Sequence, residues 1–412
     1  MMLFISGGSV VDPASGLNER SNILVRDGKV AEIGPDVRCP DGARRIDAAG
    51  LTVAPGFVDI HCHFRDPGFT YKEDIHTGAL CAAAGGFTTV VCMANTSPAM
   101  DSPELVREFV RKAAAEKIEV LTVGAITRGL AGKELVDMKA LHDAGAVGFS
   151  DDGKPLMDAG LVLRAMRTAS EAMVPLSFHE EDPSLIAANG VNATSPHTAE
   201  DVLVARDIEL ALATGAKVNI QHLSSAASVE LLRQGKRRGA SVFAEVTPHH
   251  FSLTENALQQ FGPNAKMNPP LRTEADRQAL IEGLADGTID CIATDHAPHA
   301  AHEKDVPLEK AMSGIIGLET AFALAVTHLV APGRLSLSEL VRKMSLNPAR
   351  LYGFDRGALA KGKRADIVLF DPDEEWTVSG TLSKSSNSPF MGSRLKGKVK
   401  YTVSGGEIVY EG

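Results

Sequence analysis

The sequence predicts an α/β fold: a (β/α)8 TIM barrel with a small β-sandwich subdomain built from both termini. Three observations support it. Between residues 56 and about 330, eight apolar strand-like runs alternate with amphipathic helical segments. Both chain ends carry short alternating runs typical of antiparallel strands. The 412 residues, 44% hydrophobic and 23% charged, can bury a large core. We expect 1–55 and 356–412 to form the subdomain and 56–355 the barrel.

The β regions near both termini are predicted from alternating apolar and polar residues and from turn residues between them. Residues 22–26 and 29–33 alternate around Asp27-Gly28, a typical hairpin turn. Near the C-terminus, residues 365–371, 399–403 and 408–410 read as strands, the last two joined across Gly405-Gly406. Two β-rich ends flanking one long central region suggest that the termini pair with each other. Two separate β units are the alternative.

The central region is predicted from eight runs in series, each followed by a helix candidate such as 103–116 or 226–238. The runs end near His63, Asn95, Thr127, Asp152, Glu181, Ser224, His250 and Asp295. A further helix over 336–345 should end before Asn347-Pro348. An open doubly wound sheet is the runner-up. It would carry a glycine-rich phosphate turn after its first strand, where this chain has RDPG at 65–68.

Bulk properties exclude several classes of function. A net charge of −10 without a long Lys/Arg run disfavours nucleic acid or an anionic membrane as partner. The longest apolar stretch, near 320–332, is too short for a membrane span. Five cysteines without C-x-x-C spacing indicate neither a disulfide framework nor a zinc knuckle. The N-terminus lacks signal-peptide character, so we expect a mature cytoplasmic protein.

The segment that organises the chain is HCHFRDPG at residues 61–68. A strand from Phe57 that continues to His63 would aim His61 and His63 at one face, because side chains alternate along a strand. Two imidazoles before a Pro-Gly turn are a plausible start to a transition-metal site. Alone, two histidines in a half-buried strand are common, so further ligands are needed.

Polar residues gather after several other predicted strands, at the barrel end where active sites lie. A single such residue would usually be a cap or a satisfied core group. Five strands ending this way predict a site. The candidate ligands are His61, His63, one aspartate of the pair Asp151-Asp152, His179, His222 and Asp295. They suffice for two divalent ions bridged by a carboxylate and a water, which is hydrolytic chemistry. No G-x-S-x-G or Walker-type motif appears.

These motifs resemble those of dihydroorotases of the type I class, within the amidohydrolase superfamily. The matching segments are HCHFRDPG at 61–68, MANT at 93–96, FSDDG at 149–153, AEVTPHH at 244–250, KMNPPLR at 266–272, ATDHAPH at 293–299 and NSPF at 387–390. The similarity covers essentially the whole chain. The combination is much narrower than the superfamily pattern, so the resemblance is specific.

The resemblance implies a zinc-dependent, reversible hydrolysis of L-dihydroorotate to N-carbamoyl-L-aspartate in pyrimidine biosynthesis. By family alignment, His61 and His63 would bind the first of two zinc ions, and His179 and His222 the second. Asp152 and a hydroxide would bridge them. Asp295 would touch the first zinc and act as general acid/base. The implied substrate contacts are His63, Phe64, Arg65, Asn95, Asn268, His299, Ser313 and Gly314.

Several alternatives stay open. Hydantoinases, allantoinases and some dihydroorotases bridge their metals with a carboxylated lysine, whereas here the fourth strand ends in Asp151-Asp152 and Lys154 lies beyond Gly153. The residues alone allow either aspartate; the family alignment favours Asp152. Another cyclic amidase, or a catalytically inactive scaffold, is the competing function. The resemblance also leaves open a homodimer and association with aspartate transcarbamoylase.

Overall fold

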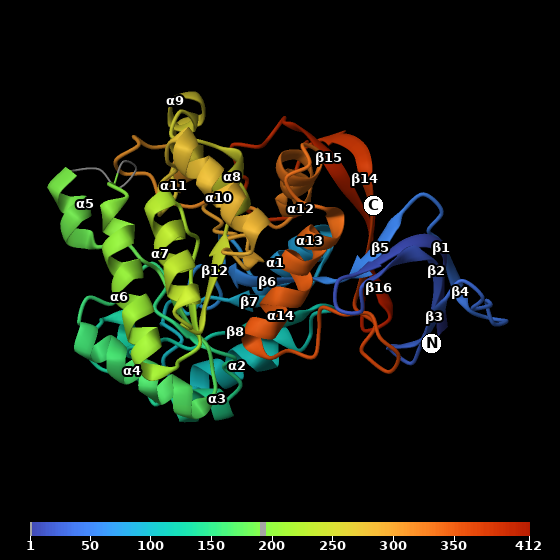
Figure 1. The fold of residues 1–412 in the computed structure, drawn as a ribbon, viewed down its shortest axis with the longest axis horizontal. Coiled ribbons are helices and arrows are strands. Elements are labelled where there is room, and N and C mark those ends of the chain that lie inside the picture. The colour runs from blue at the N-terminus through green and yellow to red at the C-terminus, as the bar shows by residue number, and fades with distance from the viewer. Residues whose placement is uncertain (1, 190–194) are drawn as a thin grey trace.

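The computed structural model describes residues 2–189 and 195–412 and has a closed parallel barrel at its centre (Figure 1). Strands β6–β8 form one parallel sheet and β9–β13 another. Isolated bridges from Gly124 to Phe149 and from Cys62 to His296 join the two sheets and close the ring. The predicted (β/α)8 class is therefore confirmed. The strands are β6 (Phe57–Cys62), β7 (Phe87–Cys92), β8 (Glu119–Thr122), β9 (Phe149–Ser150), β10 (Leu176–Phe178), β11 (Val218–Ile220), β12 (Val242–Val246) and β13 (Cys291–Ile292).

Helices follow the barrel strands, and several begin where the sequence supplies a cap. Ser102 accepts a hydrogen bond from the backbone N–H of Leu105, and Ser225 does the same for Ser228, so α2 and α7 start at the predicted positions. The helices are α1 (Ile75–Ala84), α2 (Pro103–Ala113), η1 (Arg128–Leu130), α3 (Met138–Asp143), α4 (Ala159–Ala172), α5 (Pro183–Asn189), α6 (Thr198–Thr214), α7 (Ala226–Arg237), α8 (Pro248–Ser252), α9 (Ala257–Phe261), η3 (Gly262–Ala265), α10 (Glu274–Asp286), α11 (Ala301–Lys304), α12 (Ala321–Ala325) and η4 (Val326–Val330).

The last helical region is longer than predicted. We expected it to end before Asn347-Pro348, but α13 (Leu337–Val341) continues through the wider turns of η5 (Arg342–Leu346) into α14 (Asn347–Tyr352). Pro348 lies in the first turn of α14, where a missing backbone N–H is tolerated. The proline therefore does not stop the helical path.

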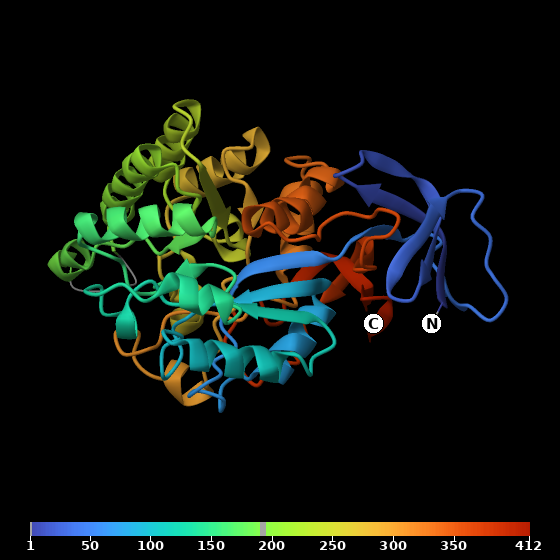
Figure 2. The same ribbon diagram turned by 90° about the horizontal axis from the view of Figure 1, so that it is seen from below.

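The two chain ends form one sheet beside the barrel, as predicted, and not two separate units. Its order is β16-β15-β14-β5-β1-β2-β3, with β4 paired to β1. Figures 1 and 2 show the blue N-terminal and red C-terminal strands on the same side of the barrel. This β-sandwich-like unit has its own apolar core, which includes Leu3, Ile23 and Ile367. The strands are β1 (Met2–Asp12), β2 (Leu17–Arg26), β3 (Lys29–Gly34), β4 (Arg44–Asp47), β5 (Thr52–Pro55), β14 (Ile367–Thr377), β15 (Arg394–Ser404) and β16 (Glu407–Glu411).

Aromatic packing fixes the terminal sheet against the barrel. The ring of Phe322 lies 5.4 Å from that of Phe57 and 4.4 Å from that of Phe370, which joins β6, α12 and β14. Such buried ring pairs contribute beyond their buried area. Phe57 begins β6, so this contact is made at the N-terminal end of a barrel strand and leaves the C-terminal ends available. All five cysteines are free. Within the described residues, no helix has both the length and the apolar character needed to cross a bilayer.

Candidate metal centre and substrate cavity

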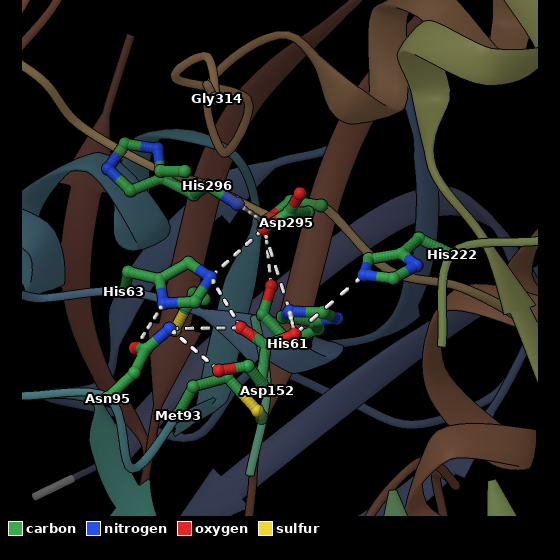
Figure 3. Close-up of polar contacts among 12 residues, drawn as sticks. His61, His63, Met93, Asn95, Asp152, His222, Asp295, His296 and Gly314 are labelled. Atoms are coloured by element: carbon green, nitrogen blue, oxygen red, sulfur yellow. Dashed lines mark hydrogen bonds and ion pairs between the residues drawn. The ribbon is translucent and has the colours of Figure 1, made fainter. Parts of the chain in front are cut away.

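The predicted ligands come together at the C-terminal ends of the barrel strands, buried from solvent (Figure 3). Among the described residues, two sets of side chains place their donor atoms within 4.8 Å of one another. One set is His61, His63 and Asp295, and the other is His61, Asp152 and His222. Strands far apart in the sequence thus supply nitrogen and oxygen donors to one point, which suits a divalent cation.

Asp152 lies at the centre of the histidines. Its Oδ1 atom is 3.4 Å from Nε2 of His61 and 3.7 Å from both Nδ1 of His179 and Nε2 of His222. Its Oδ2 atom is 3.5 Å from Nε2 of His63. Burial disfavours the ionised carboxyl, but His61, His222 and His63 together outweigh it and lower the pKa of Asp152 well below its ordinary value. The carboxylate therefore presents its two oxygens to different histidines.

Asp295 faces the first pair of histidines. Its Oδ1 atom is 3.0 Å from Nε2 of His63 and 3.5 Å from Nε2 of His61. Burial opposes ionisation of Asp295, yet His61 and His63 lower its pKa below the ordinary value. Its backbone has a φ of 45°, and His222 and Arg65 have φ of 32° and 59°. Left-handed backbone is costly for such residues, and strain of this kind concentrates at functional sites.

His179 contacts the cluster through its neighbours. Its Nδ1 atom is 2.9 Å from Nε2 of His222, and its Nε2 atom is 3.4 Å from a carboxylate oxygen of Glu181. Burial favours the neutral ring, but Glu181, Asp152 and Asp295 together outweigh this and raise the pKa of His179. In the described part of the chain, His179 lies beside the two donor sets rather than within either one.

The tautomer of His61 is fixed by Glu245 on β12. Its Nδ1 atom is 2.5 Å from Oε1 of Glu245, whose other oxygen accepts from Nδ2 of Asn219 at 2.9 Å. With its proton on Nδ1, His61 directs Nε2 toward Asp152 and Asp295. That fully buried nitrogen makes no hydrogen bond within the described residues. Burial opposes a charge on His61, but Asp152, Glu245 and Asp295 together raise its pKa, so a cation is favoured at Nε2. A metal ion would take the place of the second proton there, and a carboxylate behind the histidine is the usual support for such a ligand.

The two neighbouring aspartates, Asp151 and Asp152, have different surroundings in the structure. Oδ1 of Asp151 accepts from the backbone N–H groups of Ile126 (2.7 Å) and Thr127 (3.0 Å), so this carboxylate is already hydrogen-bonded to the loop that follows β8. Asp152 faces the histidines instead. Lys154 is exposed. Of the two candidate aspartates, only Asp152 has the geometry of a ligand.

A cavity of about 450 Å³ opens beside the cluster. It is lined by all but one of the predicted substrate contacts: His63, Arg65, Asn95, Asn268, His299, Ser313 and Gly314. Phe64 is the exception, because its side chain is buried against Gly78 in the core. The metal-ligand candidates Asp152, His179, His222 and Asp295 line the same cavity. Donors for a metal and polar groups for a ligand therefore share one space.

One end of the cavity is cationic. Nε of Arg65 donates to the carbonyl of Pro298 at 3.2 Å. Nε2 of His299 donates to the carbonyl of Ser313 at 2.8 Å, and Nζ of Lys72 donates to its Nδ1 at 3.3 Å. Burial and the adjacent Arg65 lower the pKa of His299 to about 3. His299 is thus a neutral N–H donor beside a permanent positive charge, an arrangement suited to a carboxylate.

Two asparagines complete the lining. Oδ1 of Asn95 is 2.9 Å from Nδ1 of His63, and its Nδ2 donates to Oδ2 of Asp152 at 3.1 Å. Asn95 therefore joins two of the metal-ligand candidates. Oδ1 of Asn268 is buried and has no hydrogen-bond partner among the described residues. Asn268 lines the cavity, and an unsatisfied acceptor on a lining residue suits a ligand N–H group.

Comparison with known proteins agrees with this geometry. Residues 52–409 match the amidohydrolase family. The chain belongs to that family. It is 54% identical to a dihydroorotase of Clostridioides difficile, over 99% of this chain and all of that protein. It is 53% identical to a dihydroorotase of Clostridium acetobutylicum over the full length of both. The resemblance predicted from the motifs is confirmed.

A solved structure supports the fold independently. The L-hydantoinase (dihydropyrimidinase) from Arthrobacter aurescens superimposes with a TM-score of 0.91 and is 29% identical, over 99% of this chain and 96% of that one. Its identity to this chain is much lower than that of the dihydroorotases. Family membership together with the His and Asp sets makes this a metal-dependent type of hydrolase.

Proposed function

We propose that this protein is a dihydroorotase, which hydrolyses the cyclic amide L-dihydroorotate reversibly to N-carbamoyl-L-aspartate. Two dihydroorotases that are 54% and 53% identical over essentially the whole chain support this activity. The observation that carries the proposal is the shared cavity, in which Arg65 and His299 lie close to the His and Asp donors. A six-membered cyclic amide that bears a carboxylate has both features that this cavity can recognise.

The metal proposal is two zinc ions. His61, His63 and Asp295 would hold the first, His179 and His222 the second, and Asp152 would bridge them, since its two oxygens face different histidines. When bound, zinc lowers the pKa of water and polarises a carbonyl. Glu245 keeps the Nε2 lone pair of His61 directed at the ions.

Asp295 is the proposed general acid/base. It would take a proton from the attacking water as the ring amide opens, and deliver it to the departing ring nitrogen. In ring closure the same carboxyl would reverse these roles. Its Oδ1 atom lies near both His61 and His63, so it is held at the point where the proposed ligands meet the cavity.

The substrate carboxylate would be bound by Arg65, Asn95 and His299. Arg65 can form a charge-assisted pair with it, and the neutral His299 can donate from Nε2 once its bond to Ser313 is exchanged. The free Oδ1 of Asn268 would accept from a ring N–H. The backbone at Gly314, which lines the same cavity, would contact the ring from the opposite segment.

The competing functions have less support. A hydantoinase has the same fold, but the solved L-hydantoinase is more distant than the dihydroorotases. Arg65 and His299 also favour a ring that bears a carboxylate. An inactive scaffold is disfavoured because every predicted ligand is present and buried at one site. Four points stay predictions: the domain division at residues 55 and 355, the cytoplasmic location, a homodimer, and association with aspartate transcarbamoylase.

The test is an assay of the purified protein on L-dihydroorotate and on an unsubstituted hydantoin. Before and after chelation and zinc reconstitution, zinc content is measured on the same samples. We expect turnover of dihydroorotate that is lost on chelation and restored by zinc, with a clear preference over the neutral hydantoin. Equal or better use of the hydantoin would favour the other cyclic amidases. Zinc binding without turnover of either compound would favour the scaffold.

A further inference from the structure

A segment of the C-terminal region, residues 383–388, crosses to the cationic end of the substrate cavity. It precedes β15 in the chain, yet its contacts are with residues that follow β6 and β13. The segment contains Asn387, the first residue of the NSPF motif, to which the proposed reaction assigns no role. Asn387 is buried. Its surroundings show what it does.

The carboxamide of Asn387 joins two pieces of backbone that line the cavity. Its Oδ1 atom accepts from the backbone N–H of His299 at 3.0 Å. Its Nδ2 atom donates to the carbonyls of Ala297 and Gly314, both at 3.0 Å. The backbone carbonyl of Asn387 also accepts from the N–H of Ile316 at 3.0 Å. One residue therefore fixes the segment of the carboxylate-binding histidine relative to that of the ring-contacting glycine.

Asn387 acts through these neighbours and does not line the substrate cavity itself. Gly314 has a φ of 124°, and a Cβ there would lie 2.7 Å from Cβ of Ala297, so the two segments approach closely. Nζ of the buried Lys304 also donates to the Gly314 carbonyl, at 2.9 Å. Two donors on one carbonyl leave this peptide little freedom to tilt.

The rest of the segment supports His299 from its other side. The hydroxyl of Ser385 donates to the backbone carbonyl of Lys72 at 2.7 Å, and Lys384 pairs with Asp74 at 2.5 Å. Lys72 in turn donates to Nδ1 of His299. The C-terminal segment thus holds both the backbone of His299 and the lysine that sets its tautomer.

We propose that Asn387 is a positioning residue for substrate binding, which sets the separation of His299 and Gly314 across the cavity. The C-terminal region therefore completes the substrate site, in addition to its part in the terminal sheet. This inference deepens the proposed dihydroorotase function and rests on it for its kinetic test. Its structural test is independent of the substrate.

The kinetic test compares Asn387→Ala and Asn387→Asp with wild type. The aspartate keeps the shape and the acceptor for His299, but places a carboxylate oxygen against the carbonyls of Ala297 and Gly314. We expect KM for dihydroorotate to rise about tenfold or more in both variants, with kcat within about threefold and zinc content unchanged, because binding and not chemistry is disturbed. Equal KM, or a loss confined to kcat, would overturn the proposal.

Asn22 offers a matched control. Its Oδ1 atom also accepts from a backbone N–H, that of Gly7 at 2.9 Å, and its Nδ2 atom also donates to two carbonyls, those of Pro35 and Val37. It lies in β2, away from the cavity. Asn22→Ala should lower the melting temperature without changing KM. A KM change as large as that of Asn387→Ala would mean that general destabilisation explains both.

Hydrogen exchange on the zinc-loaded enzyme without substrate provides the structural test. The amide of His299 should lose protection in Asn387→Ala and keep it in Asn387→Asp, whose carboxylate still accepts from that N–H. Unchanged protection in Asn387→Ala would contradict the inference whatever the enzyme's substrate. If wild type has no activity on dihydroorotate but this exchange pattern is seen, the proposed function fails while the positioning role stands. If Asn387→Ala does not fold, the isosteric Asn387→Asp still decides the KM question.

Discussion

Replacing Glu245 by glutamine should weaken metal binding although it removes no proposed ligand. Glu245 and His61 are fully buried, and their contact is 2.5 Å long. A glutamine carbonyl can still accept from Nδ1 of His61, but its NH2 group then faces the NH2 group of Asn219, donor to donor. The charge that raises the basicity of His61 is also lost. Loss of such a partner costs about 10- to 100-fold in metal affinity, or about 1.4 to 2.7 kcal/mol.

The assay is competition for zinc against a chromophoric chelator, with Asp290→Asn as control. Asp290 is a half-buried carboxylate near β12, and it bonds to Lys236 and to the backbone of Ala244 instead of to a proposed metal ligand. We expect weaker zinc binding in Glu245→Gln and wild-type affinity in Asp290→Asn, which should affect stability only. Equal zinc affinity in Glu245→Gln and wild type would refute the role given to Glu245.

Three further predictions concern the cluster and the cationic end. Asp152→Ala should lose zinc and activity while Lys154→Ala keeps both, as measured by elemental analysis and by turnover of dihydroorotate. Loss of zinc only in Lys154→Ala would reverse the assignment. Arg65→Met should raise KM for dihydroorotate by about 10- to 100-fold, because a charge-assisted pair is worth about 1.5 to 3 kcal/mol, and zinc content should not change; an unaffected KM would exclude this pairing. The pKa of His299 falls from an ordinary 6.5 to about 3 in the folded protein, so the unfolded chain binds the proton first. The contribution of His299 to stability is therefore full above pH 6.5 and is lost as the pH falls toward 3, by up to about 1.4 kcal/mol per pH unit. In urea unfolding at pH 7 and pH 5, His299→Gln should lose less stability on acidification than wild type, and equal losses would contradict the pKa shift.

Much of the site could be predicted because its residues directly follow strands. Motifs such as HCHFRDPG and ATDHAPH place polar side chains at the C-terminal ends of barrel strands, where a closed barrel brings them together. Asp151 and Asp152 could not be separated in this way. Both follow the same short strand, and only the hydrogen bonds of Asp151 to Ile126 and Thr127 show which carboxylate is free.

Long-range partners were the part that sequence reasoning missed. Glu245 lies 184 residues from His61, and Asn387 lies 88 residues from His299. A charged residue within the apolar strand VFAEV was the available signal for Glu245, because such a residue is rarely buried without a partner. Phe64 is a predicted substrate contact that does not line the cavity. It stands between two cavity residues in the sequence, yet its side chain points into the core.

The most direct test of the proposed role of Asp295 is to measure both reaction directions against pH for wild type and Asp295→Asn. Ring opening creates a second carboxylate and releases a proton, so hydrolysis should be favoured at higher pH and cyclisation of N-carbamoyl-L-aspartate at lower pH. Asp295→Asn keeps the shape of the side chain but cannot carry a proton. We expect both directions to fall by about 100-fold or more, since this is the usual effect of losing an acid/base group. A variant that keeps a near-normal rate in either direction would show that another group transfers the proton.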